Sequence, residues 1–236
     1  MAETLVLLPG WGFTEQVFKP LREALAHSVE VQVLSLPRLA SADPELWLQA
    51  LEPELPASCW LGGWSLGGML AAELAARRGP ACAGLISLAS NACFVASEHW
   101  PQAMDAQVFA AFQQLFTRDA PAALKRFAML CAQGAGEPRS QARALQALAL
   151  TDAEALQWEL QLLAALDTRA SLAGLNVPVL HLLAERDALL PEAAAHALGA
   201  LAAAEVQLLP EAGHGFVLSH AEALAQRIVD FMGRGG

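Results

Sequence analysis

The chain has 236 residues, 55% of them hydrophobic, and a formal net charge of −10. This length is most simply one domain with a sizeable core, and the acidic balance argues against nucleic acid as a partner. The sequence has no run of 18 uncharged apolar residues, so no membrane span is predicted. The first residues lack the basic region of a signal peptide, and the four cysteines form no CxxC pair, as is typical of reduced thiols. We therefore expect a cytoplasmic protein.

The first part of the chain alternates between short apolar runs and helical segments. Strands are predicted over residues 4–8, 29–36, 59–61 and 83–89. Helices are predicted over residues 15–26, 44–51 and 66–78, with Asp43 as the N-cap of the second. Strands that alternate with helices in this way form βαβ units around a parallel sheet.

The predicted strand over 59–61 is followed by Gly62-Gly63-Trp64-Ser65-Leu66-Gly67-Gly68, which contains the pattern Gly-x-Ser-x-Gly and leads into the third helix. Between a strand and a helix this pattern indicates a nucleophile elbow, a turn so sharp that its glycines avoid Cβ clashes. Ser65 is then expected to stand exposed above the strand end, with the N–H of Leu66 facing a developing oxyanion. The alternative is an inert serine in a glycine-rich turn.

A second loop of interest follows the first strand, at Pro9-Gly10-Trp11-Gly12. Two glycines around a tryptophan suggest a backbone that approaches a ligand closely. In a hydrolase with a nucleophile elbow, the second oxyanion donor comes from this loop, and the N–H of Trp11 is the candidate. The alternative is a packed tryptophan in a tight turn.

The alternation of strands and helices stops over residues 95–173, which we name the helical insertion. Four helices are predicted in it, over residues 105–116, 120–132, 138–149 and 152–166. The insertion is either a packed appendage or a lid over a substrate pocket, and its position after the strand that follows the elbow favours a lid. Alternation then returns, with strands over 177–183 and 205–209 and helices over 191–201 and 220–231.

A serine nucleophile needs a histidine that takes its proton and an acid that orients the histidine, in the chain order Ser, acid, His. Asp187 follows the penultimate strand, and His214 lies in the glycine-flanked loop after the last strand. Parallel strands place their carboxyl ends at one sheet edge, so both residues belong beside Ser65. His220 and Glu185 remain as rivals for the base and the acid.

No metal or cofactor site is expected, because the histidines and cysteines lack ligand spacing and no phosphate loop is present. His181 lies inside a predicted strand and is expected to be buried and hydrogen-bonded. Basic residues gather over residues 118–143, where five basic and two acidic side chains give a net +3. This patch is either a docking site for an acidic partner or a set of ordinary solvated arginines.

Several of these stretches resemble the pimeloyl-acyl-carrier-protein methyl ester esterases of biotin synthesis. The similar segments are residues 5–12, 60–68, 88–94 with Trp100-Pro101, 112–114 and 125–130. The resemblance covers nearly the whole chain. The elbow is common to many hydrolases, whereas the segment over 89–101 is more specific.

The resemblance implies an α/β-hydrolase fold and a serine carboxylesterase that needs no cofactor. Such an enzyme removes the methyl group from a pimeloyl chain carried on acyl carrier protein and releases methanol. The implied catalytic residues are Ser65, Asp187 and His214, with oxyanion N–H groups from Trp11 and Leu66. The implied substrate contacts are Trp11, Leu66, Phe127, Met129 and Cys131, and the implied carrier-docking residues are Arg126, Arg139 and Arg143.

Two departures from the family pattern affect these expectations. Pro9 replaces the histidine of the usual His-Gly-Trp-Gly, which leaves the loop geometry open. Family members usually begin with two more strands, so a shortened, mostly parallel sheet of about six strands is expected. Alternatives are another α/β-hydrolase acting on small esters, a lyase or C–C hydrolase of the menaquinone-pathway type, and a non-catalytic carrier-binding module. Chain-length preference and oligomeric state stay open, with a monomer as the working expectation.

Overall fold

The structure is a computed structural model that describes residues 3–201 and 204–234. Within these residues six strands form one sheet in the order β2-β1-β3-β4-β5-β6, and every neighbouring pair is parallel. The strands are β1 (Thr4–Leu8), β2 (Glu30–Val33), β3 (Cys59–Trp64), β4 (Cys82–Leu88), β5 (Val179–Ala184) and β6 (Glu205–Leu209). The prediction of a parallel sheet of about six strands is confirmed.

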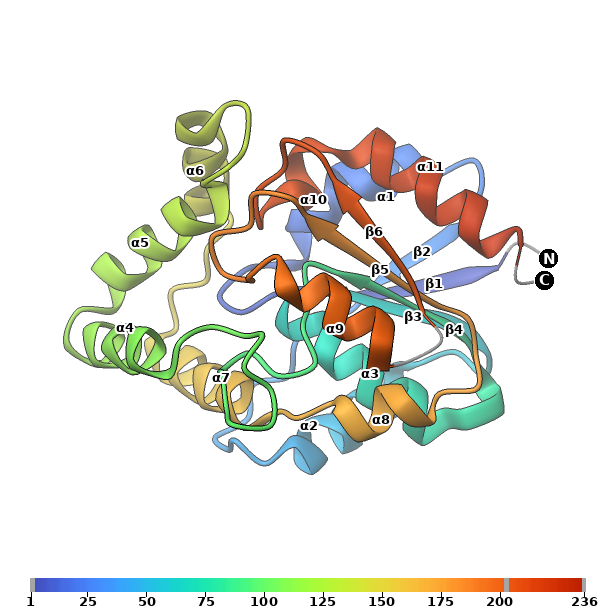
Figure 1. Cartoon of the computed structure of the whole chain (residues 1–236), viewed down its shortest axis with the longest axis horizontal. Helices are drawn as coiled ribbons and strands as arrows, with labels where there is room; N and C mark the ends of the chain where they lie inside the picture. Colours follow the sequence, from blue (N-terminus) through green and yellow to red (C-terminus); the bar gives the residue numbers. More distant parts are fainter. Residues whose placement is uncertain (1–2, 202–203, 235–236) are drawn as a thin grey trace.

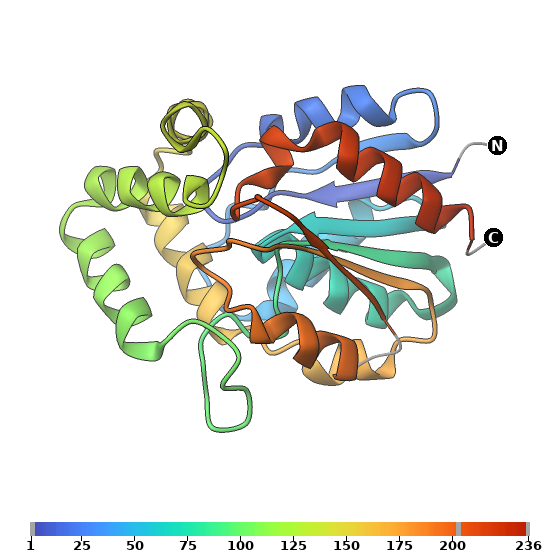
Figure 2. The same cartoon turned by 45° about the horizontal axis from the view of Figure 1, so that its top comes forward.

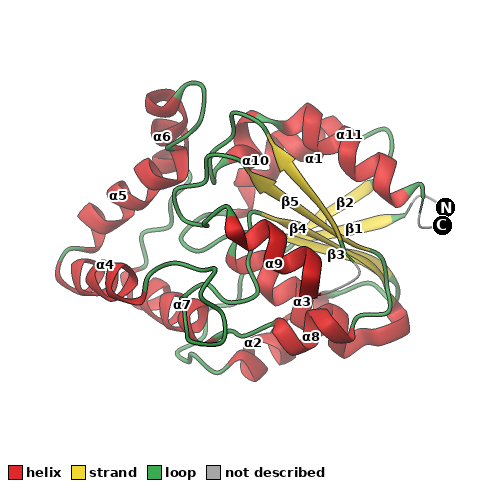
Figure 3. Ribbon diagram, viewed as in Figure 1, coloured by secondary structure: helices red, strands yellow, loops and turns green. Residues whose placement is uncertain are grey.

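Helices cover both faces of this sheet (Figures 1 and 3). On one face α1 (Lys19–Leu25) packs against α11 (Ala221–Met232). On the other face α3 (Leu66–Arg78) contacts α2 (Pro44–Leu51) and α8 (Arg169–Gly174), and α8 contacts α9 (Ala193–Leu201). Because both faces are covered, the interior strands β3 and β5 are buried along their whole length.

Local sequence explains where several elements begin and end. Asp43 caps α2 as predicted, since its side chain accepts the N–H of Glu45 at 3.0 Å. Strand β2 is shorter than predicted and ends at Val33, because its neighbour β1 ends at Leu8. The short helices α8 and α10 (Phe216–Ser219) were not predicted, since four to six residues are too few for a clear apolar period.

The helical insertion, all of whose residues are described, contains no strand. It holds α4 (Ala106–Arg118), α5 (Ala120–Ala132), α6 (Pro138–Ala147), α7 (Ala153–Ala165) and the start of α8. Asp105, Asp119 and Asp152 cap α4, α5 and α7 by accepting backbone N–H groups. Figures 1 and 2 show α4 to α7 beyond the carboxyl ends of the strands, on the side where functional residues are expected.

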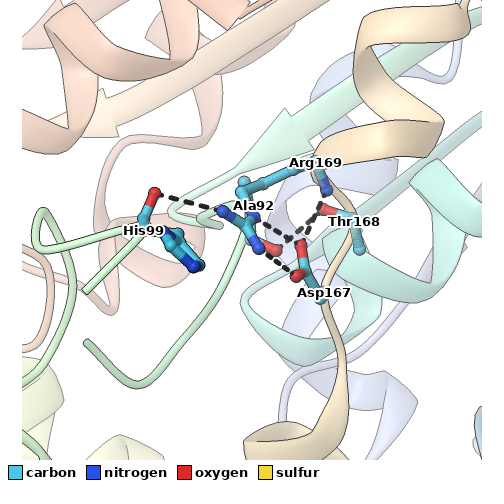
Figure 4. Close-up of polar contacts among 5 residues, drawn as sticks. All are labelled: Ala92, His99, Asp167, Thr168 and Arg169. Carbon is cyan, nitrogen blue, oxygen red and sulfur yellow. Dashed lines mark hydrogen bonds and ion pairs between the residues drawn. The ribbon is translucent and has the colours of Figure 1, made fainter. Parts of the chain in front are cut away.

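The two ends of the insertion are tied together by polar contacts (Figure 4). The Ala92 carbonyl accepts both the backbone N–H and the hydroxyl of Thr168, at 2.8 and 3.0 Å. Arg169 donates to the His99 carbonyl at 3.1 Å and pairs with Asp167, whose pKa it lowers to about 2 by hydrogen bonding. The insertion therefore leaves and rejoins the core at one place.

In the described residues, no helix is long and apolar enough to cross a bilayer. The same residues hold no group of three or more side chains that could bind a metal ion. All four cysteines are buried and unpaired. Burial raises the pKa of each thiol, that of Cys93 to about 12, so these thiols stay protonated and unreactive at neutral pH.

Candidate active site

The segment between β3 and α3 has the backbone of a nucleophile elbow. Ser65 adopts φ 54° and ψ −118°, a conformation that is strained for a residue other than glycine. A Cβ atom on Gly63 would lie 2.2 Å from the backbone of Gly67, and one on Gly67 would lie 2.0 Å from the Leu8 carbonyl oxygen. Glycine is therefore required at both positions for the turn to form.

Ser65 itself is held from two neighbouring segments. Its N–H donates to the Leu88 carbonyl at 2.9 Å, and the Ser90 hydroxyl donates to its carbonyl at 2.7 Å. The sequence predicts an exposed Ser65, and this is wrong, because the residue is only 4% exposed. The loop after β1 lies against Ser65, and the helical insertion lies beyond this end of the sheet (Figure 1).

Asp187 and His214 are in direct contact, although 26 residues separate them. The Nδ1 atom of His214 lies 2.8 Å from Oδ2 of Asp187, and both side chains are buried. The other carboxylate oxygen accepts the N–H groups of Leu189 and Leu190, at 2.8 and 3.0 Å. With Nδ1 facing a carboxylate, the lone pair of the neutral ring is on Nε2, which has no hydrogen-bond partner among the described groups.

The rivals for the base and the acid are engaged elsewhere. Glu185 is exposed and accepts the N–H of Glu211 at 3.1 Å. The ring of His220 lies 2.9 Å from the hydroxyl of the adjacent Ser219. The structure thus brings together the predicted pair, Asp187 and His214, and not the rivals.

His181, in the middle of β5, differs from its prediction. It is buried as expected, but within the described residues neither ring nitrogen has a hydrogen-bond partner. Burial lowers its pKa to about 4, so the ring is neutral at physiological pH. The residue lies inside the sheet and takes no part in the site.

The loop after β1 approaches the elbow closely. A Cβ atom on Gly10 would lie 3.3 Å from Cβ of Ser65, and Gly12 adopts φ +79°, which favours glycine. This places the backbone around Trp11 beside the nucleophile. Leu66 is the first residue of α3, so its N–H is one of the donors that no helical carbonyl satisfies. Both N–H groups proposed for the oxyanion hole thus border Ser65.

The helical insertion fixes this loop through three hydrogen bonds. The Gly12 carbonyl accepts the N–H of Leu150 at 2.8 Å, and the N–H of Thr14 donates to the Leu148 carbonyl at 3.1 Å. The Trp11 indole N–H donates to the Leu156 carbonyl of α7 at 2.8 Å. The conformation of the loop therefore depends on residues more than 130 positions away.

An apolar cavity of about 190 Å³ lies between the insertion and the loop. Its lining residues are Trp11, Phe94, Met104, Val108, Phe109, Ala111, Phe112, Arg126, Phe127, Leu130, Leu160, Leu163 and Leu189. The Trp11 indole packs edge-on against Phe112, Phe116 and Phe127. The cavity thus begins at the loop beside the nucleophile and extends under α4, α5 and α7.

Of the three residues expected to line an acyl pocket in α5, the structure brings only Phe127 to the cavity. Met129 is 52% exposed, because it lies two positions after Phe127 and its side chain therefore points to the opposite side of α5. Cys131 is buried outside the cavity, and its carbonyl accepts the N–H of Gly215 at 2.7 Å. Sequence analysis did not identify the lining residues of α4 and α7. In the sequence they are marked only as part of the apolar face of each helix, which does not distinguish a cavity lining from the core.

Arg126, Arg139 and Arg143 are all exposed. Arg126 borders the apolar cavity, and the other two lie on α6. None of the three forms an ion pair with another described residue. Their charges are therefore available to a partner.

A smaller, more polar cavity of about 140 Å³ is lined by Pro9 and Phe13 of the loop and by Glu159 of α7. Glu159 is 3% exposed, and burial raises its pKa to about 7, although the Gly12 N–H acts in the opposite direction. Sequence analysis did not single out this residue, since a glutamate in an amphipathic helix is usually solvated.

Comparisons with known proteins show what the chain is similar to. The model of the alpha/beta hydrolase family matches residues 5–227. A pimeloyl-[acyl-carrier protein] methyl ester esterase from Aromatoleum aromaticum is 37% identical, over 96% of this chain and 96% of that protein. The biotin biosynthesis bifunctional protein BioHC from Cellvibrio japonicus is 41% identical over 96% of this chain, but the chain spans only 47% of that protein.

Among solved structures, an esterase from Exiguobacterium antarcticum superposes with a TM-score of 0.85 at 20% identity. The match covers 98% of this chain and 92% of that one. At this identity the likeness supports the fold alone.

Proposed function

Because the chain belongs to the alpha/beta hydrolase family, and within it to the pimeloyl-[acyl-carrier protein] methyl ester esterases, we propose that it hydrolyses the methyl ester of a pimeloyl chain on acyl carrier protein. The observation that carries the proposal is the 2.8 Å contact between His214 and Asp187 at the sheet edge that holds the strained Ser65. An apolar cavity that could hold a long acyl chain is lined by Trp11 of the loop beside Ser65 and by Leu189, whose N–H bonds to Asp187.

In the first half of the proposed reaction, the Ser65 hydroxyl oxygen attacks the ester carbonyl carbon and its proton passes to Nε2 of His214. Asp187 stabilises the imidazolium that forms. The N–H groups of Trp11 and Leu66 stabilise the negative charge on the carbonyl oxygen. The bond to the methoxy oxygen then breaks, His214 donates its proton to that oxygen, and methanol leaves an acyl-enzyme on Ser65.

In the second half, a water molecule attacks the acyl carbon and gives one proton to His214. Collapse of the tetrahedral intermediate breaks the bond to Ser65, and His214 returns its proton to the serine oxygen. The product is a free carboxylate at the end of the carrier-bound chain. No cofactor enters either half of the reaction.

The apolar cavity is the proposed site of the acyl chain. Each buried methylene group contributes about 0.8 kcal/mol, so a chain in contact with Phe127 and its neighbours gains binding free energy from its length. Arg126 borders the same cavity. The proposed acidic carrier would contact Arg126, Arg139 and Arg143 while its acyl chain enters beside them.

The test is methanol release from pimeloyl-acyl-carrier-protein methyl ester. Ser65→Ala is expected to abolish turnover. A variant with alanine at Arg126, Arg139 and Arg143 is expected to raise KM for the carrier-bound ester and to leave hydrolysis of a small free ester unchanged. Turnover by Ser65→Ala would contradict the mechanism, and activity confined to small esters would contradict the carrier-bound substrate.

The proposal also includes a cytoplasmic location and a monomer. Cell fractionation and size-exclusion chromatography with light scattering test these two parts separately from the chemistry. Neither result changes the interpretation of the methanol assay.

A further inference from the structure

The loop that carries His214, residues 210–215, contacts the helical insertion directly. Gln141 of α6 is 7% exposed, and its side-chain N–H donates to the Gly215 carbonyl at 2.5 Å. A second, longer contact joins the same nitrogen to the Ser219 hydroxyl at 3.3 Å. A buried amide of α6 thus bonds to the residue that follows His214.

The other polar group of Gly215 is also held by the insertion. Its N–H donates to the Cys131 carbonyl of α5 at 2.7 Å. On the other side of His214, a Cβ atom on Gly213 would lie 2.1 Å from the Gln133 carbonyl oxygen. The backbone on both sides of the histidine is therefore packed against the end of α5 and the start of α6.

The core makes a separate contact with the same histidine. The Trp64 indole N–H donates to the His214 carbonyl at 2.9 Å, and Asp187 orients the ring. Trp64 and Cys131 thus hold the two ends of the His214–Gly215 peptide, whereas Gln141 holds the carbonyl of the following peptide. Without the two insertion contacts, rotation of the Gly215 backbone would shift the His214 ring relative to Ser65.

A buried amide at this position costs stability. The Oε1 atom of Gln141 is buried and has no hydrogen-bond partner among the described groups, and an unpaired buried carbonyl is unfavourable. An apolar side chain of similar size would avoid this cost. The hydrogen bond that its N–H group donates to the Gly215 carbonyl explains why a polar side chain lies at this position.

We propose that Gln141 is a positioning residue, which holds the His214 loop so that Nε2 faces Ser65. The inference rests on the proposed function, because it requires His214 to act as the general base. Gln141 lies between Arg139 and Arg143 on α6, so the helix that presents the proposed docking charges also holds the catalytic base. Gln141 acts through His214 and does not touch the substrate.

The experiment compares Gln141→Leu with Gln146→Leu in the hydrolysis of p-nitrophenyl butyrate. Gln146 is a matched control, since it lies on α6, is half-buried and makes no side-chain hydrogen bond in the part of the chain described. Gln141→Leu is expected to lower kcat by roughly 10- to 100-fold, because misplacement by about 1 Å costs this much. KM should stay within about 2-fold, and Gln146→Leu should change neither constant by more than about 2-fold.

Thermal unfolding shows whether each variant is folded. If Gln141→Leu does not fold, Gly215→Ala displaces the same contact, because its Cβ would lie 3.0 Å from the Gln141 nitrogen. A folded Gln141→Leu with unchanged kcat, or a change in KM alone, would overturn the inference, as would an unchanged kcat in Gly215→Ala. Ser65→Ala in the same assay keeps the two proposals separate, since its activity bears on the proposed function alone.

Discussion

The nucleophile elbow and the His214 loop both belong to the candidate active site, but different kinds of interaction fix their conformations. The elbow is seven consecutive residues, 62–68, whose strained turn depends on glycines within the segment and on the adjacent strand β1. The His214 loop is held by Asp187, which follows β5, and by Cys131 and Gln141 of the helical insertion. One half of the proposed catalytic centre is encoded locally, and the other half is assembled by tertiary contacts.

This difference predicts that substitutions in the two segments have different effects on folding and on the reaction rate. A change in the elbow should disturb folding and chemistry together, because the turn is part of the central β3–α3 unit. A change around the His214 loop should slow the reaction in a protein that still folds, because the sheet does not depend on that loop. Four sets of variants test this, from the largest expected effect to the smallest.

Gly67→Ala should have the largest effect. Its Cβ would lie 2.0 Å from the Leu8 carbonyl oxygen, and backbone cannot move by that much without disrupting β1 and α3. We expect a loss of about 4 kcal/mol or more in the free energy of unfolding, together with loss of activity. Gly136→Ala is the control, because nothing lies within 4 Å of the added atom. A stable, active Gly67→Ala protein in denaturant titration would contradict the requirement for glycine in the elbow.

Asp187→Asn should come next and should act on rate alone. The amide cannot stabilise the imidazolium or select the correct tautomer of His214, so kcat should fall by about 10³- to 10⁴-fold. Glu185→Gln, two residues earlier and bonded to the Glu211 backbone, should change kcat by less than about 2-fold. Equal losses in the two variants, measured with the same ester, would remove Asp187 from the proposed triad.

Phe127→Ala should test the cavity. Removal of this ring should cost about 3 kcal/mol of stability and should raise KM for long acyl esters more than for short ones. Met129→Ala on the exposed side of α5 should cost less than about 0.5 kcal/mol and should not alter chain-length preference. The reverse ranking of the two variants on a series of p-nitrophenyl esters would place the acyl chain elsewhere.

Glu159→Gln should have the smallest effect, and it should depend on pH. The folded protein holds the Glu159 proton up to a pKa of about 7, against an ordinary value of 4.5. The wild type should therefore lose stability as the pH rises through this range, by at most roughly 3 kcal/mol, whereas the glutamine variant should not. The measurement is urea unfolding at pH 5 and pH 8.5. Glu154→Gln, exposed on the same helix, should keep the wild-type pH dependence.

The locally encoded half of the molecule could be predicted from the sequence. The alternation of strands and helices specified the parallel sheet, and the predicted bounds of α3 and β6 match the structure. The elbow glycines at 63 and 67 could be identified because the Gly-x-Ser-x-Gly pattern lies within one short segment. Asp187 and His214 were placed at the correct edge because parallel topology alone brings strand ends together.

The assembled half could not be predicted in detail. The burial of Ser65 depends on how the insertion covers the sheet edge, and no periodicity encodes that placement. The family resemblance implies that Met129 lines the acyl cavity, but the orientation of α5 turns it to solvent. Gln141 and Glu159 resemble ordinary polar residues of amphipathic helices, and only their tertiary partners distinguish them.

The central claim is that Ser65 is the nucleophile of a serine esterase. The most direct test is to treat the protein with a p-nitrophenyl alkylphosphonate and to locate the adduct by peptide mass spectrometry. We predict one adduct per chain, on Ser65, formed at a rate that falls sharply in His214→Ala. Absence of an adduct, or an adduct on another residue with Ser65 unmodified, would contradict the account.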